Sequence, residues 1–443
     1  MYLAPDIRPA PVTMAAAFWY WLKLGFISFG GPAGQIALMH TELVEKRRWI
    51  SEQRFLHALN YCMLLPGPEA TQLAIYIGWL MHKARGGIMA GVLFVLPSLL
   101  LLIVLSWVYL AYGSMPVVAG ILYGIKPAIV AVVLAAAWRI GTRSLRNRIL
   151  AGIAVAAFLA ITVLELPFPL IVLAAAVVGF AGGRLLPAHF QVGGKHPDSR
   201  ASYGFALIDD DTPTPEHATF TWMRLARVGV SGAVLGLGAW LLLAQQTGAG
   251  GTLAQMGWFF TKAALMTFGG AYAVLPYVYQ GGVEHYQWLT ATQMIDGLAL
   301  GETTPGPLIM IVAFVGFVGA WTQAVFGGNV ALAGMAGALV ATYFTFLPSF
   351  IFILAGGPLV ESTRDNVRMT APLTAISAAV VGVIVSLAVF FGKHVFLAGP
   401  QPDWAAVAIC AAACVALFRY QAGTIKLIAA CALAGLVLSY WHG

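Results

Sequence analysis

Two lysines lie in segments where a membrane protein rarely keeps a charge. Lys23 and Lys262 each stand six residues before a Phe-Gly-Gly sequence, inside apolar surroundings. A lysine at the centre of a membrane helix costs about 2.5–3.5 kcal/mol on insertion scales, and this chain keeps it at the same position twice. We expect the pair to face an anion pathway. The alternative is that each long side chain reaches the membrane surface with its ammonium group.

Two glutamates accompany a second glycine-containing motif. Glu69 directly follows Pro66-Gly67-Pro68, and Glu302 lies three residues before Pro305-Gly306-Pro307. The protonation of a carboxylate in a poorly hydrated site responds to a nearby cation or bound anion, which is what a proton-coupled step requires. Both glutamates are therefore candidates for proton coupling, with a structural role at a helix end as an equal alternative.

Four breaks interrupt the apolar segments beside these charges. Gly-Gly lets the backbone turn and approach a ligand, Pro pre-sets the next helical turn, and free N–H groups at such a helix start attract anions. Arms of about fifteen residues reach the middle of a bilayer, where broken helices are tolerated only around a protein-lined cavity. A single glycine or proline would be attributed to packing or a kink, but four breaks in register favour a substrate site. The expected substrate-binding residues are Lys23, Phe29, Gly30, Gly31, Pro32, Pro66, Gly67, Pro68, Thr71, Gln72, Lys262, Gly269, Gly270, Thr303, Thr304, Pro305, Gly306 and Pro307.

Other polar residues are weaker candidates. The threonine hydroxyls could bind an oxyanion, but hydroxyls in membrane helices more often bond their own backbone. Lys126 precedes Pro127 in an apolar segment, whereas its counterpart in the second half is Ala371. His57 and Asp296 occupy matched positions, and we expect both at helix surfaces or interfaces.

The chain contains the same sequence pattern twice. A shift of 239 residues superimposes Lys23 on Lys262, Phe29-Gly30-Gly31 on Phe268-Gly269-Gly270, and Pro66-Gly67-Pro68 on Pro305-Gly306-Pro307. With about twelve further residues inserted, Leu-Pro-Ser at 96–98 matches Leu-Pro-Ser at 347–349. This register indicates a tandem duplication.

Composition places the duplicated chain in a membrane. Its 443 residues are 60% hydrophobic and 9% charged, with helix-length apolar runs, which predicts an all-α polytopic membrane protein. The net charge of +7 comes from short loops, so we expect no nucleic-acid partner. The four cysteines form no metal-ligand spacing and are expected to pack in the core. No catalytic set, phosphate loop, zinc motif or cofactor-binding motif is present, so the sequence predicts a transporter rather than an enzyme.

The domain order follows from the repeat. We expect a first repeat at 1–189, an exposed polar cytoplasmic linker at 190–222, an extra linking transmembrane helix at 223–246, and a second repeat at 247–443. One unpaired helix would invert the second repeat relative to the first.

Loop charges favour that inversion, because Lys and Arg collect on the cytoplasmic side. All basic clusters share one side if the four breaks form re-entrant hairpins, each copy has four further crossings, and the extra helix crosses once. The N-terminus is then cytoplasmic and the C-terminus periplasmic. The clusters are Lys46 to Arg48 with Arg54, Lys83 with Arg85, Arg139 to Arg148, Arg184 to Arg227, Arg364 with Arg368, and Arg419 with Lys426. Full crossings at every apolar segment are the alternative, and they would place Arg139 to Arg148 outside.

These motifs carry a family resemblance. FGGPAGQIALMHTELVEKRRWI and LLPGPEATQLAIYIGW in the first copy, with TFGGAYAVLPYV and GETTPGPLIMIVAFVGF in the second, resemble the chromate ion transporter family in its long two-domain form. The resemblance implies an inner-membrane protein that exports chromate from the cytoplasm, driven by the electrochemical gradient, and thereby confers resistance. In the second copy Pro32 is replaced by Ala271 and EATQ by LIMI, so we expect the first copy to carry more of the coupling.

Rival functions remain open at this point. Chromate resembles sulfate in shape and charge, so a general sulfate or oxyanion transporter is the close rival, and a passive anion channel is another. A membrane enzyme such as a chromate reductase is disfavoured because nothing indicates a flavin, haem or nucleotide site. The lipid bilayer is the expected surrounding, and a homo-oligomer is neither required nor excluded.

Overall fold

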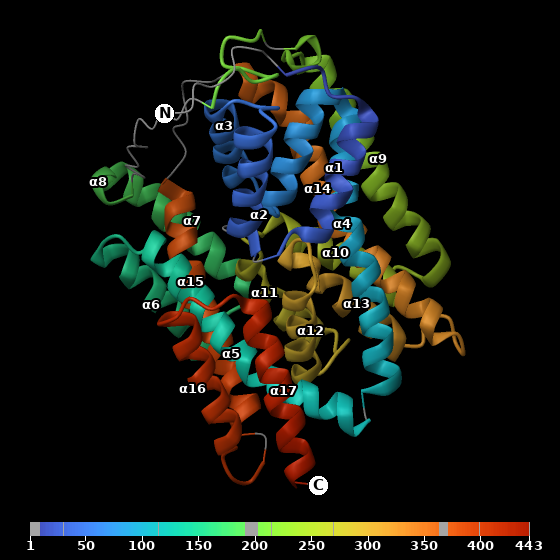
Figure 1. Cartoon of the computed structure of the whole chain (residues 1–443), viewed down its shortest axis with the longest axis vertical. Coiled ribbons are helices and arrows are strands. Elements are labelled where there is room, and N and C mark those ends of the chain that lie inside the picture. The colour runs from blue at the N-terminus through green and yellow to red at the C-terminus, as the bar shows by residue number, and fades with distance from the viewer. Residues whose placement is uncertain are drawn as a thin grey trace.

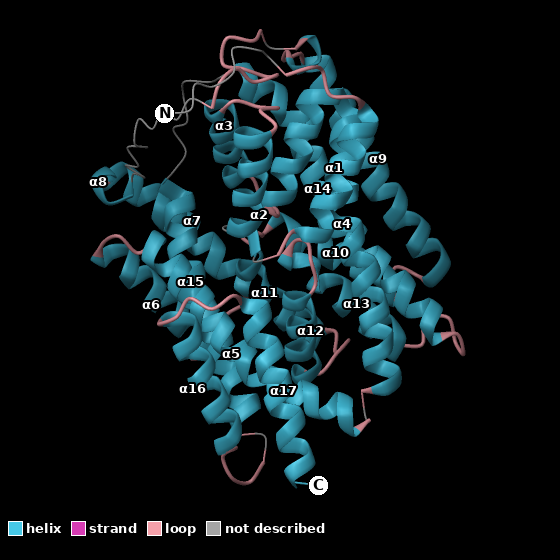
Figure 2. Ribbon diagram, viewed as in Figure 1, coloured by secondary structure: helices cyan, strands magenta, loops and turns pink. Residues whose placement is uncertain are grey.

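The computed structural model describes residues 9–29, 31–113, 115–190, 203–213, 215–268, 270–362, 371–397 and 399–442, and helices dominate them (Figure 2). Within these ranges six helices are long and apolar enough to cross a membrane. They are Glu69–Tyr112, Pro116–Ser144, Phe168–Leu185, Trp222–Thr247, Val330–Leu359 and Ala371–Phe396. The predicted all-α polytopic membrane fold is confirmed.

The first repeat begins with broken helices. Its elements are α1 (Met14–Ile27), α2 (Gly31–His40), the π-helix η1 (Thr41–Lys46), α3 (Glu52–Leu64) and α4 (Glu69–Tyr112). Both expected breaks therefore fall between helices. A further reversal lies inside α4 at His82 and Lys83, which have non-helical backbone angles. Gly78 and Gly86 pack against each other across that turn, so the two halves of α4 run antiparallel.

The second repeat has the same order of elements. They are α10 (Thr252–Leu265), α11 (Ala271–Tyr279), the π-helix η3 (Gln280–His285), α12 (Ala291–Thr303), η4 (Leu308–Met310), α13 (Ile311–Thr322) and α14 (Val330–Ser362). Here too Gly316 meets Gly337 at backbone distance, which brings α13 and α14 together as a hairpin. Each repeat thus contains one such hairpin after its Pro-Gly-Pro break.

The remaining helices of both repeats form a six-helix bundle at the lower left of Figure 1. The bundle consists of α5 (Pro116–Ser144), α6 (Arg148–Thr162), α7 (Phe168–Leu185), α15 (Ala371–Phe396), α16 (Trp404–Phe418) and α17 (Thr424–His442). Glycines let its helices approach closely. A Cβ on Gly124 of α5 would meet Gly435 of α17, and one on Gly382 of α15 would meet Ala154 of α6. Each repeat therefore contributes to both the hairpin region and the bundle.

The segment between the repeats was expected to be exposed, and in the part that the structure describes it is largely exposed or half-buried but docked at three buried residues, Ala206, Ile208 and Ala218. The chain continues from α7 through α8 (Pro187–Phe190) to η2 (Glu216–Ala218) and α9 (Trp222–Thr247). Ile208 forms a β-bridge with Ile50, and Ile208 and Ala218 are buried. Gly232 is the single buried residue described in α9, so most of this helix lies on the surface.

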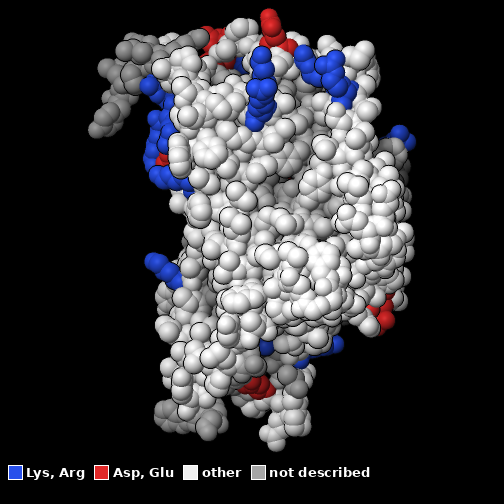
Figure 3. Space-filling view, turned by 90° about the vertical axis from the view of Figure 1, so that its right-hand side faces the viewer, with Lys and Arg blue, Asp and Glu red and all other residues white. Residues whose placement is uncertain are grey.

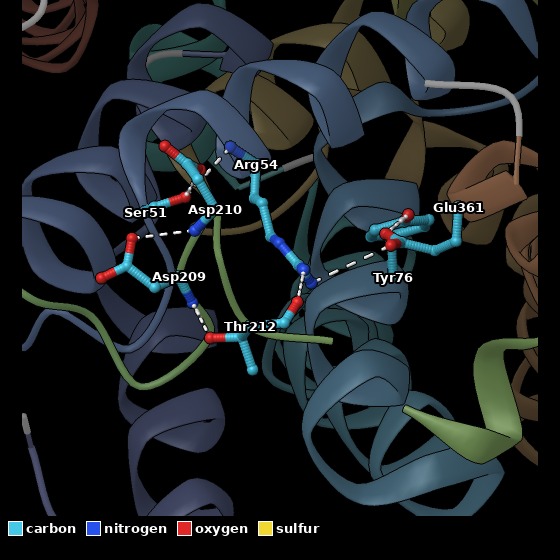
Figure 4. A network of polar contacts seen from close by, with 7 residues as sticks. All are labelled: Ser51, Arg54, Tyr76, Asp209, Asp210, Thr212 and Glu361. Carbon is cyan, nitrogen blue, oxygen red and sulfur yellow. Dashed lines mark hydrogen bonds and ion pairs between the residues drawn. The ribbon is translucent and has the colours of Figure 1, made fainter. Parts of the chain in front are cut away.

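A polar network joins the docked segment to both repeats (Figure 4). The guanidinium of Arg54 in α3 donates to the carbonyl of Thr212 in the segment and lies 3.9 Å from the carboxylate of Glu361 in α14. Tyr76 of α4 donates to the same carboxylate at 2.5 Å. Ser51, at the start of α3, donates to Asp210 at 2.5 Å.

On the face that Figure 3 shows, Lys and Arg gather mainly in the upper part of the molecule, and the broad middle region carries few charged residues. The π-helix η1, the end of α5 at Arg143 and the start of α17 at Thr424 line the mouth of one cavity. The docked segment lies at the same end, where Leu207 donates to the carbonyl of Arg48. We call this end the basic face. Arg364 and Arg368, one of the predicted clusters, lie outside the described residues.

Candidate functional site

The four breaks meet at one centre through hydrogen bonds between the repeats. The N–H of Gly67 donates to the carbonyl of Thr267 at 2.8 Å, and the N–H of Gly306 donates to the carbonyl of Ser28 at 2.7 Å. Ser28 and Thr267 are equivalent in the 239-residue register. The Pro-Gly-Pro break of each repeat is therefore bonded to the Phe-Gly-Gly break of the other.

Glycine is required at both Pro-Gly-Pro breaks. Gly67 has φ +129° and Gly306 has φ +107°, a region that residues with a side chain rarely adopt. A Cβ on Gly67 would lie 2.5 Å from the hydroxyl oxygen of Ser349, and one on Gly306 would lie 2.7 Å from the Cβ of Ser98. Ser98 and Ser349 end the repeated Leu-Pro-Ser motifs, so these motifs pack on the opposite repeat's break.

Polar oxygen atoms without a partner surround this centre. Among the described residues, five buried side chains near the breaks each have an oxygen with no hydrogen-bond partner. They are Ser28, Gln35, Thr71, Gln72 and Ser98. A buried polar group left without a partner costs about 1–3 kcal/mol. Three of these oxygens are the hydroxyl groups of Ser28, Thr71 and Ser98.

The first repeat supplies more of this polarity than the second. The amide of Gln35 donates to the carbonyl of Gly306 at 2.6 Å, and the amide of Gln72 donates to a carbonyl of its own Pro-Gly-Pro break at 2.8 Å. The equivalent positions in the second repeat are Val274 and Ile311. The centre is therefore symmetric in its backbone and asymmetric in its side chains.

A cavity of about 630 Å³ leads from the basic face to the breaks. Its lining includes Gly31, Pro32 and Gly270 from the breaks, together with both Glu69 and Glu302. Two carboxylates that are not equivalent in the repeat thus reach the same space. They lie on opposite repeats, which places the cavity between the repeats.

Two arginines of α5 bring positive charge into the cavity. Arg139 and Arg143 line it, and Arg139 interacts electrostatically with Glu302. The hydroxyl of Tyr272 at the start of α11 donates to the carboxylate of Glu302. An arginine beside a carboxylate and an open anion path can change partner when an anion arrives.

Helix starts add further anion-binding capacity. α4 begins after Pro68 and α11 begins after Gly270, and neither start has a side-chain cap. Their first N–H groups are therefore left for a ligand or water. Glu69 and Ala271, the first residues of these helices, both line the cavity.

A smaller depression of about 410 Å³ lies on the opposite face and is the repeat image of the cavity. Its residues from α11 and η3 occupy the positions that cavity-lining residues occupy in α2 and η1, shifted by 239. The pairs are Ala37 with Pro276, His40 with Tyr279, Thr41 with Gln280, and Glu45 with Glu284. No residue of the four breaks lines this depression within the described part of the chain. Of these two spaces, the cavity on the basic face is the one whose lining includes residues of the breaks.

The predicted lysines do not line the cavity. Lys23 is exposed, because α1 buries the face that carries Trp21 and Leu24 instead. Lys262 lines a shallow pocket beside Glu284 and has its ammonium 5.8 Å from the ring centre of Trp258. The expectation that both lysines face a shared path is not met in this structure.

The other predicted residues divide between the centre and its surroundings. Thr71 and Gln72 belong to the centre, whereas the hydroxyls of Thr303 and Thr304 donate to carbonyls of their own helix turn. Phe29 is exposed at 37%. Gly30 and Gly269 lie outside the described residues.

Several site residues were missed from the sequence. Arg139 and Arg143 were assigned only to a loop cluster, since the facing direction of α5 is not visible in a uniformly apolar helix. Gln35 stands in the FGGPAGQ motif and could have been noticed as a polar residue close to a break. The repeated Leu-Pro-Ser motif was the available signal for Ser98.

Known proteins are similar over nearly the whole chain. The family model described as chromate transporter matches residues 15–180 and 254–436, one region in each repeat. A chromate transport protein of Cupriavidus metallidurans is 29% identical over 98% of this chain and 96% of its own length. A chromate transport protein of Pseudomonas aeruginosa is 32% identical over 85% of this chain and 80% of its own length. An uncharacterized transporter of Methanocaldococcus jannaschii is 24% identical over 96% of this chain and 93% of its own length. No solved structure matches the chain.

Proposed function

This chain belongs to the chromate transporter family, and we propose that it exports chromate from the cytoplasm across the inner membrane and thereby confers chromate resistance. The observation that carries the proposal is the cavity that joins the basic face to both Phe-Gly-Gly breaks and to the glutamates beside both Pro-Gly-Pro breaks. Transporters with inverted repeats place their substrate between discontinuous helices near the middle of the membrane.

The direction of transport rests on the charges of the two faces. Lys and Arg collect on the cytoplasmic side of membrane proteins, so the basic face is assigned to the cytoplasm. The C-terminus is then periplasmic. With this orientation the cavity is open to the compartment from which chromate must be removed.

Chromate binding is assigned to the breaks and to α5. Arg139 and Arg143 attract the dianion into the cavity, where electrostatic attraction also raises its local concentration. The N–H groups at the starts of α4 and α11, with the hydroxyls of Ser28 and Thr71, then replace part of its hydration shell. Hydrogen-bond donors of this kind suit any tetrahedral oxyanion, which keeps sulfate as the close competitor.

Proton coupling is assigned to Glu69 and Glu302. Both line the space that the anion must enter, and Arg139 lines the same space. An arriving dianion competes for Arg139 and leaves the carboxylate without its cation, which favours protonation. Since the membrane potential favours outward movement of an anion by about 2.3 kcal/mol per charge per 100 mV, coupling adds to an existing driving force.

Reconstitution separates a coupled exporter from a passive channel. Purified protein in liposomes is given a membrane potential alone, a pH gradient alone, or both, and chromate flux is followed. A secondary exporter accelerates with the pH gradient at fixed potential. Flux that follows the potential and ignores the pH gradient would show a channel, and absence of chromate flux under all three conditions would reject the proposal.

A further inference from the structure

A buried carboxylate joins the two repeats away from the cavity. Asp296 of α12 is 2% exposed, accepts a hydrogen bond of 2.9 Å from the hydroxyl of Tyr109 in α4, and lies 3.6 Å from the ammonium of Lys126 in α5. We call Tyr109, Lys126 and Asp296 the Asp296 cluster. Two of its members come from the first repeat and one from the second.

The cluster lies between the breaks and the opposite face. α12 begins at Ala291 near that face and ends at Thr303 beside a break, and Asp296 is seven residues before this end. At about 1.5 Å per residue, the carboxylate is about 10 Å from the break along the helix. Any path from the centre to the opposite face must pass the level of this cluster.

The helix of the first repeat that corresponds to α12 is α3, and α3 faces the cavity. Leu56 and Leu59 of α3 line the cavity that reaches the basic face. Their repeat counterparts in α12 are Ile295 and Leu298, which are 1% and 0% exposed. The helix α12 is therefore packed against its neighbours, whereas its repeat counterpart α3 is separated from the bundle by the cavity.

The sequence provides a charge pair, Lys126 with Asp296, on the side of the centre that faces away from the basic face, and no equivalent pair on the other side. The repeat counterpart of Asp296 is His57, and the 251-residue shift that superimposes the two Leu-Pro-Ser motifs places Ser377, rather than Ala371, at the position of Lys126. A serine cannot form an ion pair, so the open side has no equivalent of the Lys126–Asp296 contact. The asymmetry of the sequence thus coincides with the asymmetry of the two cavities.

We propose that the Asp296 cluster is the gate on the opposite face of the transporter, which holds α12 against α4 and α5 and separates when the centre opens to that face. The inference rests on the proposed transport function. An ion pair suits this task because the desolvation cost and the attraction nearly cancel. Separation into a water-filled vestibule hydrates both charges, so the two states stay close in free energy.

Two repeat-related cysteine reporters test the gate. Leu298→Cys and Leu59→Cys are introduced separately into a chain whose four native cysteines are replaced. Oriented membranes are then treated with a thiol reagent that cannot cross them. With the cluster intact, Leu59→Cys reacts from the basic face, and Leu298→Cys is protected from the opposite face.

Asp296→Asn is expected to reverse this pattern. Because labelling follows the population of the open state, we expect the Leu298→Cys reporter to react about tenfold faster from the opposite face and the Leu59→Cys reporter to react more slowly. Tyr109→Phe is a milder second variant that removes one hydrogen bond and should change both rates in the same directions. Exchanging the charges, with Lys126→Asp and Asp296→Lys together, should restore protection.

Tyr123→Phe is the matched control. Tyr123 also lies on α5 and donates at 2.8 Å to a carboxylate, that of Asp403, which caps α16 and does not belong to α12. It should leave both labelling rates unchanged. If Asp296→Asn and Tyr109→Phe insert normally and Leu298→Cys stays protected, the cluster is a static structural contact and the gate is rejected.

The labelling readout needs no substrate, so it fails or succeeds independently of the proposed function. A shift in labelling in a protein that moves no chromate would retain the gate and reject the substrate. Chromate transport with unshifted labelling would retain the function and reject the gate.

Discussion

The amide of Gly306 in the second repeat donates a hydrogen bond of 2.7 Å to the carbonyl of Ser28 in the first. The repeat image of this bond joins Gly67 to Thr267 at 2.8 Å. The duplicated halves therefore complete each other at the breaks, and neither half contains the whole centre. Symmetry ends at the side chains, where Gln35 and Gln72 have apolar counterparts.

Alanine at either Pro-Gly-Pro glycine should disrupt the centre. Gly67→Ala and Gly306→Ala add a Cβ within 2.7 Å of the opposite repeat and force an unfavourable backbone angle. We expect each to cost about 1–3 kcal/mol from backbone strain, to lower the melting temperature in detergent and to abolish transport. Gly327→Ala is the control, since Gly327 has φ +60° with no atom within 4 Å of its Cβ position, and it should retain transport. Equal effects at all three glycines would contradict a specific role for the breaks.

Removing a cavity arginine should weaken chromate binding more than removing Lys23 of α1. Arg139→Ala removes positive charge from the cavity, so we expect the KM for chromate to rise about tenfold, the factor for a loss of about 1.4 kcal/mol. Lys23→Ala removes a charge from the exposed side of α1 and should leave KM unchanged. Initial uptake rates over a range of chromate concentrations measure both. If Lys23→Ala raises the KM and Arg139→Ala does not, the anion path is lined by the lysine and not by the arginine.

Replacing a cavity carboxylate should remove the response to a pH gradient. Glu302→Gln keeps the shape of the side chain and its contact with Tyr272 but cannot take up a proton. We expect uptake driven by the membrane potential to persist and its acceleration by a pH gradient to disappear. Glu284→Gln on the opposite face is the control and should keep the acceleration. Persistence of the pH-gradient response in both Glu302→Gln and Glu69→Gln would exclude these residues from coupling.

The network between the repeats and the docked segment should contribute strongly to stability. Arg54 and Glu361 are each 7% exposed, and removing one partner of a buried pair costs about 3–5 kcal/mol. Arg54→Ala should therefore lower the melting temperature clearly. Lys46→Ala breaks the more exposed pair with Glu42, which is worth at most about 1 kcal/mol, and should have little effect. Thermal unfolding followed by a fluorescent thiol dye or by aggregation gives the comparison.

Much of the fold was predictable because glycines, prolines and loop charges act locally. The four helix breaks were expected from Phe-Gly-Gly and Pro-Gly-Pro, and the all-helical fold from hydropathy. Asp296 lies at an interface, one of the two alternatives expected for it. Sequence spacing could not indicate that Arg139 of α5 and Glu302 of α12 line the same cavity, since the two residues come from different repeats.

Contacts between distant segments were the least predictable part. The docking of Ile208 on Ile50 depends on tertiary packing, and a polar composition alone suggested an exposed segment. The direction of Lys23 depends on which face of α1 packs against α4, and an apolar helix with little periodicity does not reveal it.

Chromate uptake into energised everted membrane vesicles, with and without a large excess of sulfate, tests the central claim most directly. In such vesicles the cytoplasmic face is outside, so an exporter with its cavity on the basic face accumulates chromate inside. We predict accumulation of chromate that is lost in the Gly306→Ala vesicles, and accumulation that persists under excess sulfate would show selectivity for chromate. Accumulation abolished by sulfate would indicate a general oxyanion carrier, and vesicles that accumulate no chromate would contradict the account.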